Sequence, residues 1–375
     1  MIVSRIGDFH SLYTFNFVGF SCVIHSQNFC SWSHRCWLGI KIPINQSWIS
    51  MSDRAPNNRT LTCTPKEMSE LSKSILEIDR HVQIQDISNQ LICGDFFDVA
   101  KFFPTEFIDL LILDPPYNLT KKFHGTCFKQ QDQRQYASWF RATIECLIPM
   151  MKSSASIYVC SDWMTSMHIS AVLEENFIIR NRITWERDKG RGAKRNWKNN
   201  SEDIWFCTMS DEYTFNVDVV KLKRRVLAPY QANGEAKDWS KEQGGNYRFT
   251  YPSNLWTDLT VPFWSMPENT DHPTQKPEKL VAKLILASSN QDDFVFDPFV
   301  GSGTSAVVAQ KLGRKWCGID LHMDYLCWAT KRLLATDQDS TIQGYHDGVF
   351  WERNSKPIQG RHLQSTSLFS ETNGN

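Results

Sequence analysis

The sequence predicts a doubly wound α/β fold, in which helices cover both faces of a mostly parallel sheet. From Leu91 onward, short apolar runs alternate with helix-like segments, and this alternation implies helices that connect parallel strands. A glycine-rich turn, Gly301-Ser302-Gly303, separates one such strand from the helix that follows it. Because open sheets of this kind bind ligands at the carboxyl ends of their strands, we expect functional residues directly after the strands.

The expected elements follow one another in order, each supported by its own pattern. Strands are expected where apolar and β-branched residues cluster, at 91–93, 108–113, 155–159, 178–185 and 203–207, from Phe294, and at 316–320. Helices are expected at 65–76, 136–147, 165–174, 277–287 and 305–312, with a last helix through Leu334. Trp139, Phe140, Ile144 and Leu147 illustrate the helical spacing of apolar residues in 136–147.

Composition divides the rest of the chain. Residues 1–50 form an atypical extension without Glu or Ala, and we hypothesise that Met51 is the native start; a small accessory layer is the alternative. The expected segments after it are a helical and polar segment at 51–90, the two halves of the α/β domain at 91–209 and 272–335, an insertion at 210–271 and a polar tail at 336–375. We expect little regular structure in the insertion and poor packing in the tail.

A stiff motif follows the strand 108–113. Asp114-Pro115-Pro116-Tyr117 brings one carboxylate, two prolines and one aromatic ring to the carboxyl end of that strand. Prolines fix φ and lack a backbone donor, so the turn holds the carboxylate and the carbonyls toward a ligand. The flat ring of Tyr117 suits a flat substrate. These features predict a catalytic site formed by Asp114, Pro115, Pro116 and Tyr117.

A second motif follows the strand that begins at Phe294. In Asp297-Pro298-Phe299-Val300-Gly301-Ser302-Gly303 the glycines permit a tight turn, and the next helix offers free N–H groups to a polar ligand. No Lys follows Gly303, so this is not a phosphate-binding P-loop. Asp320 ends the next strand, where a carboxylate can accept ribose hydroxyls. A nicotinamide enzyme would share this half of the pattern, but it has no need of Asp114-Pro115-Pro116-Tyr117.

Together with His272-Pro273-Thr274-Gln275-Lys276-Pro277, these motifs resemble those of the S-adenosylmethionine-dependent amino-methyltransferases of DNA. Their order is that of the beta class, and the resemblance covers about 91–334. It implies a Rossmann-like methyltransferase sheet with S-adenosyl-L-methionine as cofactor and with the target-recognition region in the insertion 210–271. The residues implied to bind the cofactor are Asp95, Thr274, Lys276, Asp297, Phe299, Gly301, Ser302, Gly303, Thr304 and Asp320. In this family Asp95 would face the adenine amine of the cofactor, and Lys276 its carboxylate.

The motif also indicates the chemistry. Asp114 and the carbonyl of Pro115 can each accept one N–H of an exocyclic base amine, so that the nitrogen lone pair points at the methyl group, while Tyr117 stacks on a flipped base. An acid at the first motif position favours adenine N6 over cytosine N4, which stays open. The absence of a Pro-Cys dipeptide argues against a cytosine-C5 enzyme. RNA or protein acceptors and a catalytically silent DNA-binding subunit are the remaining alternatives.

The charge pattern bears on partners. Net charge is zero, so any DNA contact must come from local patches. We expect one at Arg187, Lys189, Arg191, Lys194, Arg195 and Lys198; Lys221, Lys223, Arg224 and Arg225 form a second. A solvated face is the plainer interpretation of such runs. Double-stranded DNA is the expected partner, and the sequence leaves open whether the chain is a monomer or a homodimer and whether a cognate restriction endonuclease exists.

Cysteine usage and hydropathy bear on the compartment. The chain has 11 cysteines but no CxxC pair, which indicates a reduced protein without a metal site. No apolar stretch reaches bilayer length, so we expect no membrane contact. The expected location is the cytoplasm of a bacterial-type cell, with nucleoid association through DNA.

Overall fold

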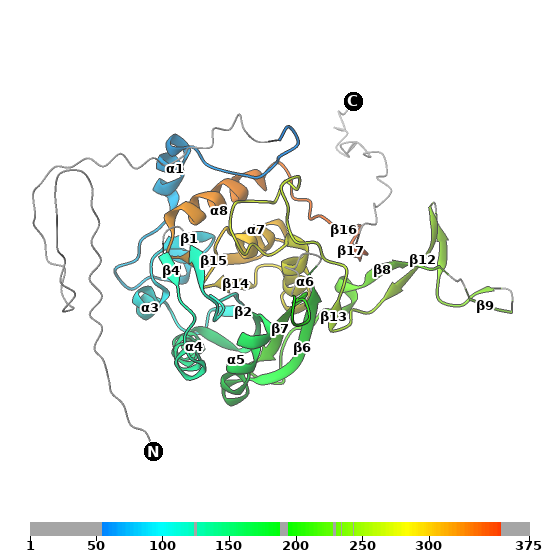
Figure 1. The fold of residues 1–375 in the computed structure, drawn as a ribbon, viewed down its shortest axis with the longest axis horizontal. Helices are drawn as coiled ribbons and strands as arrows, with labels where there is room; N and C mark the ends of the chain where they lie inside the picture. Colours follow the sequence, from blue (N-terminus) through cyan, green and yellow to red (C-terminus); the bar gives the residue numbers. More distant parts are fainter. Residues whose placement is uncertain are drawn as a thin grey trace, which may run out of the picture. The chain divides into compact units, whose positions relative to one another are not determined.

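One large sheet organises the chain, and its strands form where the sequence has short apolar runs. The computed structural model describes residues 55–123, 126–187, 194–227, 230–233, 235–242 and 244–353. The strands of the main sheet are β1 (Gln90–Cys93), β2 (Ile108–Leu113), β5 (Met151–Ser161), β6 (Ile178–Glu186), β7 (Ser201–Thr208), β13 (Leu255–Trp256), β14 (Phe294–Asp297) and β15 (Lys315–Asp320). Their order across the sheet is β1-β15-β14-β2-β5-β7-β6-β13 (Figure 1).

The pairing confirms the predicted mostly parallel sheet. Neighbouring strands are parallel except in the two pairs that involve β7, which lies antiparallel between β5 and β6. The described residues between β6 and β7 contain no helix, and a parallel connection needs a longer crossover. At the centre, β2 pairs with β14, although about half the chain separates them in sequence. The ends of these two strands therefore meet where the strand order changes direction.

Helices cover both faces of the sheet. They are α1 (Pro65–Leu71), α2 (Ile84–Ile87), α3 (Phe96–Val99), α4 (Gln133–Leu147), α5 (Trp163–Asn176), α6 (Glu278–Ser288), α7 (Thr304–Lys311) and α8 (Met323–Ala335), with 3₁₀ turns at Ser72–Ser74, Ala100–Phe102, Ile148–Met150 and Val217–Val220. Capping side chains set several of the starts: Thr64 caps α1, Asp132 caps α4 and Asp162 caps α5. The predicted helix 65–76 is thus a short α-helix followed by a 3₁₀ turn.

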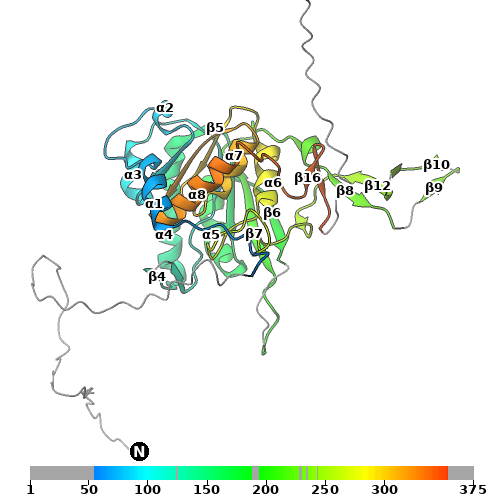
Figure 2. The same cartoon turned by 90° about the horizontal axis from the view of Figure 1, so that it is seen from above.

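Alternate residues of β2 enter two separate cores. Leu110 and Ile112 pack in one core with residues of α6, α7 and α8, whereas Leu111 and Leu113 pack in the other with residues of α4 and α5. Figures 1 and 2 show these two groups of helices on opposite faces of the sheet. Burial on both faces explains why β2 is a continuous apolar run in the sequence.

A second sheet corrects two expectations. Its strands are β8 (Leu222–Arg225), β11 (Ser240–Glu242), β12 (Gly245–Thr250), β16 (Tyr345–His346) and β17 (Val349–Trp351), in the order β11-β12-β8-β17-β16. The insertion 210–271 therefore contains regular structure, and β8 with β12 extends away from the main sheet (Figure 1). The tail is not poorly packed up to Arg353, because β17 pairs with β8 and Phe350 is fully buried.

Two short hairpins complete the described elements, β3 (Lys121–Phe123) with β4 (Thr126–Phe128) and β9 (Gln231–Ala232) with β10 (Glu235–Ala236). The extension 1–50 and the proposed start at Met51 lie outside the described residues, as does the tail after Arg353. Within the described ranges, none of the helices combines the length and the apolar character needed to cross a membrane.

Candidate active site

The predicted motifs converge on one cavity. Because β1, β2, β14 and β15 are parallel, their carboxyl ends lie at the same edge of the sheet, and the residues that follow them surround a cavity of about 500 Å³. The predicted residues that line it are Asp95, Asp114, Pro115, Pro116, Tyr117, Thr274, Phe299, Gly301 and Asp320. Lys276, Asp297, Ser302 and Thr304 line a smaller adjoining space of about 40 Å³. Gly303 lines neither.

Hydrogen bonds from neighbouring segments fix the Asp114-Tyr117 turn. The hydroxyl of Tyr136 on α4 donates to the carbonyl of Pro116 at 2.9 Å. The next residue, Asn118, is buried: its amide nitrogen donates to the carbonyl of Gln131 at 3.0 Å and its amide oxygen accepts the Gln131 N–H at 2.8 Å. The backbone of Asn118 also donates to the Thr165 hydroxyl at 3.1 Å. These bonds supplement the stiffness of the two prolines and fix where the Asp114 carboxylate and the Tyr117 ring point.

Lys276 contacts the carboxylate of this motif directly. Its Nζ lies 2.7 Å from each carboxylate oxygen of Asp114 and 3.0 Å from the hydroxyl of Tyr117. Burial lowers the pKa of Lys276, but the carboxylates of Asp114 and Glu202 outweigh burial and raise the pKa above its usual value. The family resemblance implied that Lys276 lies near the carboxylate of the cofactor; in the structure its ammonium contacts the carboxylate of Asp114.

Two glycines in the turn after β14 have backbone conformations that other residues adopt only with strain. Gly301 and Gly303 have φ of 52° and 81°. A Cβ at Gly303 would lie 2.5 Å from the Cβ of Ala329 on α8, and one at Gly301 would lie 3.0 Å from the His272 ring. Gly303 thus allows α7 and α8 to approach, and Gly301 keeps the cavity wall open.

Asp320 and Asp297 hold the same turn through their carboxylates. One oxygen of Asp320 accepts the N–H of Gly301 at 3.0 Å and the other accepts the N–H of His322 at 2.8 Å. Asp297 is buried, accepts the N–H of Phe299 at 3.0 Å and accepts the hydroxyl of Ser305. Burial raises the pKa of Asp297 to about 7. Both carboxylates therefore order the turn, whatever else they bind.

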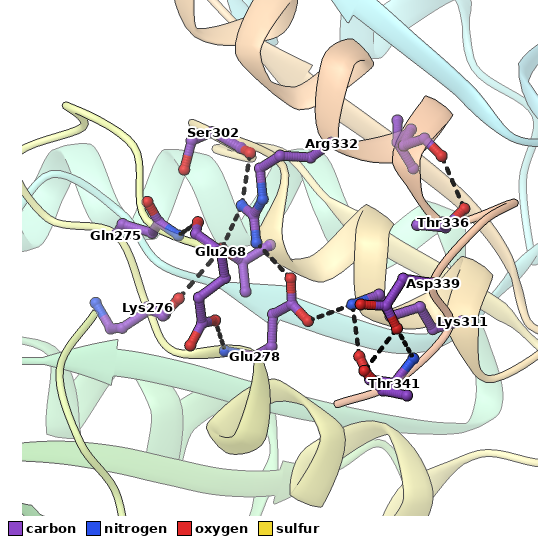
Figure 3. Close-up of polar contacts among 12 residues, drawn as sticks. Glu268, Gln275, Lys276, Glu278, Ser302, Lys311, Arg332, Thr336, Asp339 and Thr341 are labelled. Carbon is purple, nitrogen blue, oxygen red and sulfur yellow. Dashed lines mark hydrogen bonds and ion pairs between the residues drawn. The ribbon is translucent and has the colours of Figure 1, made fainter. Parts of the chain in front are cut away.

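Behind the turn lies a buried ionic network that the sequence did not reveal (Figure 3). The guanidinium of Arg332 donates to the carbonyl of Ser302 at 2.8 Å, to the Thr304 hydroxyl at 3.0 Å and to Glu278 at 2.9 Å. Glu278 also pairs with Lys311 at 2.7 Å. Arg332 is only 4% exposed, yet in the sequence it is an ordinary cation of a helix, so no pattern distinguishes it from a surface residue. The network connects α6, α7 and α8 to the turn.

Glu268, in the same network, makes stability depend on pH. Burial, followed by the charge of Glu278, raises the pKa of Glu268 from 4.5 to about 7. A carboxyl with a raised folded-state pKa binds its proton more tightly in the folded than in the unfolded chain, so its contribution to stability is lost as pH rises from 4.5 to about 7.

We therefore expect the melting temperature of Glu268→Gln, relative to wild type, to rise between about pH 5 and about pH 8, because glutamine has no charge to bury. Calorimetric melts at both pH values measure this difference. Glu174→Gln makes the same change at an exposed position of α5 and serves as control. A Glu268→Gln difference that stays constant with pH would contradict the assignment.

The expected DNA-binding cations are only partly described. Lys189 and Arg191 lie outside the described residues, whereas Lys194, Arg195 and Lys198 are exposed between β6 and β7. Arg187 instead pairs with Glu202, with 2.5 Å between guanidinium and carboxylate. In the second patch, Lys221, Lys223 and Arg224 pair with Asp218, Glu242 and Glu352. Trp197, 95% exposed beside the first cations, was not singled out from the sequence.

A model of the N6/N4 methylase family, described as DNA methylase, matches residues 108–331. The chain belongs to this family. It is a DNA amino-methyltransferase that uses S-adenosyl-L-methionine, as the sequence predicted, and DNA is its substrate. The cavity fits this cofactor, because apolar walls such as Phe299 and Trp139 surround the carboxylates of Asp95 and Asp320.

Relatives of this DNA amino-methyltransferase are found among curated proteins. It is 34% identical over 251 residues to the DNA adenine methyltransferase YhdJ of Escherichia coli (strain K12), a match that covers 65% of this chain and 82% of the relative. It is 31% identical over 262 residues to the type II methyltransferase M.HpaI of Haemophilus parainfluenzae, covering 69% and 77%. Among solved structures, the cytosine-N4-specific PvuII DNA methyltransferase matches with a TM-score of 0.49 and 19% identity, covering 65% and 85%.

Proposed function

We propose that the chain methylates the N6 amine of adenine within a short duplex DNA sequence, after flipping the base out of the helix. The observation that carries this proposal is the Asp114 carboxylate beside the Tyr117 ring in the wall of the cavity. An acid at this position favours adenine, and the relative that is 34% identical is named a DNA adenine methyltransferase. Cytosine N4 is the alternative acceptor within the same family.

The proposed chemistry depends on hydrogen-bond acceptors for the amine. An exocyclic amine is a poor nucleophile because its lone pair is delocalised into the ring. Asp114 and the carbonyl of Pro115 each accept one N–H, which localises the lone pair on the nitrogen and directs it toward the methyl group. The bound cofactor supplies that methyl group on a positively charged sulfur. Tyr117 stacks on the base, and stacking offsets part of the cost of flipping.

The remaining cavity residues are proposed to hold the cofactor. Asp95 follows β1 and Asp320 is the last residue of β15, and we assign them to the adenine amine and the ribose hydroxyls of the cofactor. The oxygens of Asp320 already accept one N–H each, but a carboxylate oxygen has a second lone pair for a hydroxyl donor. Thr274, Phe299, Gly301 and the turn that contains Ser302 complete the proposed binding set.

The test is to identify the modified nucleoside. DNA from cells that express the full chain is digested and its nucleosides are separated and weighed, and modification-sensitive sequencing then locates the modified sites. We expect N6-methyldeoxyadenosine in one short sequence, absent when Asp114→Ala replaces wild type. N4-methyldeoxycytidine would overturn the choice of adenine, and the absence of both would overturn the proposal.

We further propose that the loop between β6 and β7 binds DNA phosphates and that the segment 210–271 reads the sequence. Reversing the charge of Lys194, Arg195 and Lys198 should weaken binding to all DNA sequences. The slope of log affinity against log salt should also become shallower by about 3, because each phosphate contact that is lost means about one counterion fewer released on binding. Fluorescence anisotropy at several salt concentrations measures this. Reversal of the exposed Lys66, Lys73 and Lys101 is the control, and equal slopes for both triple variants would contradict the proposal.

A further inference from the structure

Glu202 lies at the catalytic edge of the sheet because β7 runs in the reverse direction. The first residues of β7 pair with the last residues of β5, so that Asp203 is opposite Ser161. The amino end of β7 therefore reaches the edge where the parallel strands have their carboxyl ends. Glu202 is 6% exposed there. Its position in the sequence did not mark it as a candidate, because a charged residue at the start of a strand is not distinctive.

Three functional groups surround the Glu202 carboxylate. The hydroxyl of Tyr117 donates to Oε2 at 3.0 Å, and Nζ of Lys276 lies 3.5 Å from the same oxygen. The guanidinium of Arg187 binds Oε1 at 2.5 Å. Lys276 in turn contacts both oxygens of Asp114 at 2.7 Å. Glu202 is thus bonded to the ring residue of the Asp114-Tyr117 motif and to the cation that holds its carboxylate.

We propose that Glu202 is a positioning residue for methyl transfer: it fixes Lys276 between two carboxylates and so holds the side chains of Asp114 and Tyr117 in place. This inference rests on the proposed role of Asp114 as acceptor of the amine N–H. With Glu202 present, the buried carboxylate of Glu202 and the partly exposed carboxylate of Asp114 face two cations, Lys276 and Arg187. Without its charge, Arg187 loses the carboxylate that it binds and Lys276 keeps that of Asp114, and a buried cation whose charge is less well compensated is costly.

The groups that face Lys276 show which charges stabilise its ammonium. They are Asp114 and Tyr117 after β2, Cys160 on β5 and Glu202 on β7. Burial, with Asp114 next, raises the pKa of both the Tyr117 hydroxyl and the Cys160 thiol, so these two groups stay neutral. The charge of Glu202 is thus one of two that oppose the effect of burial on Lys276, and its removal should lower the pKa of Lys276.

The experiment compares Glu202→Gln with Asp203→Asn in the full chain. Asp203 is the next residue of β7 and is 7% exposed, and its carboxylate lies 3.8 Å from Arg182. The control variant therefore removes one carboxylate charge from the same strand at a similarly buried position. We measure kcat and KM for DNA, the Kd of S-adenosylmethionine by calorimetry and the melting temperature. Wild-type activity in the same assay is the reference.

For Glu202→Gln we expect kcat to fall about tenfold with little change in KM for DNA, and a change in cofactor Kd of about twofold or less. Asp203→Asn should keep the wild-type kcat. Glu202→Asp, which keeps the charge, should restore most of the lost kcat.

The outcomes separate this inference from the proposed function. If Glu202→Gln lowers the melting temperature while kcat matches wild type, Glu202 has only a structural role and the inference is wrong. A loss of kcat of equal size in Asp203→Asn would also overturn it. Failure of the proposed function would instead appear as the absence of N6-methyladenine with the wild-type chain.

Discussion

Asp114→Ala is expected to abolish methyl transfer, with a loss in kcat of about 10³-fold or more, because the amine loses the carboxylate that accepts its N–H. The cofactor Kd should change only a few-fold, since Asp114 is assigned to the base amine. The buried ammonium of Lys276 keeps Glu202 and Tyr117 as neighbours, so the variant should fold. Single-turnover methylation and calorimetric titration of S-adenosylmethionine measure the two effects separately.

Asp109 offers a matched control for this variant. It lies near the other end of β2, where it pairs with Lys152 at 2.8 Å and accepts the N–H of Phe294. Asp109→Asn should affect the melting temperature without affecting the methylation rate. If Asp114→Ala methylated DNA at a rate close to that of wild type, the proposed mechanism would be wrong.

Tyr117→Ala should have the second largest effect, because it removes the ring proposed to stack on the flipped base. Stacking of this kind is worth about 1–3 kcal/mol per base, which corresponds to a loss in kcat/KM of about 5- to 150-fold. The fluorescence of 2-aminopurine at the target position reports flipping directly. We expect a weaker fluorescence increase with Tyr117→Ala than with wild type at equal occupancy.

Tyr117→Phe separates the ring from the hydroxyl. The hydroxyl accepts from Lys276 and donates to Glu202, so phenylalanine loses two hydrogen bonds but keeps the stacking surface. We expect Tyr117→Phe to retain the flipping signal and most of the activity that Tyr117→Ala loses. Equal damage in both variants would mean that the hydroxyl matters and the ring does not.

The sequence predicts the central part of the fold well because burial on both faces leaves a strong signal. The run Ile108–Leu113 is found as a strand with the same bounds, and the strands 91–93 and 316–320 differ from β1 and β15 by one residue each. Convergence of Asp114, Asp320 and Asp95 could also be predicted, since parallel strands end at one edge of a sheet. Local pattern and one topological rule suffice for this part of the site.

The parts that could not be predicted depend on contacts between distant residues. The direction of β7 is set by its partners β5 and β6, and apolar pattern carries no strand direction. Glu202 and Arg332 are buried by tertiary packing, whereas a charged residue in a sequence is ordinarily assigned to the surface. Strands as short as β16 and β17 leave too few residues for a period to be recognised.

The pairing of β17 with β8 has a consequence for the construction of chimeras. Lys279 of α6 donates both to the carbonyl of Asp258 and to that of Trp351. One side chain of the α/β domain therefore binds both the insertion and strand β17. A chimera that transplants 210–271 alone from a relative would place a foreign β8 beside the native β17, and the pairing of these strands and their shared contact with Lys279 would be disturbed. Recombination boundaries should therefore carry the donor's own counterpart of 342–353 with the insertion, as one exchangeable unit composed of two separate stretches of chain.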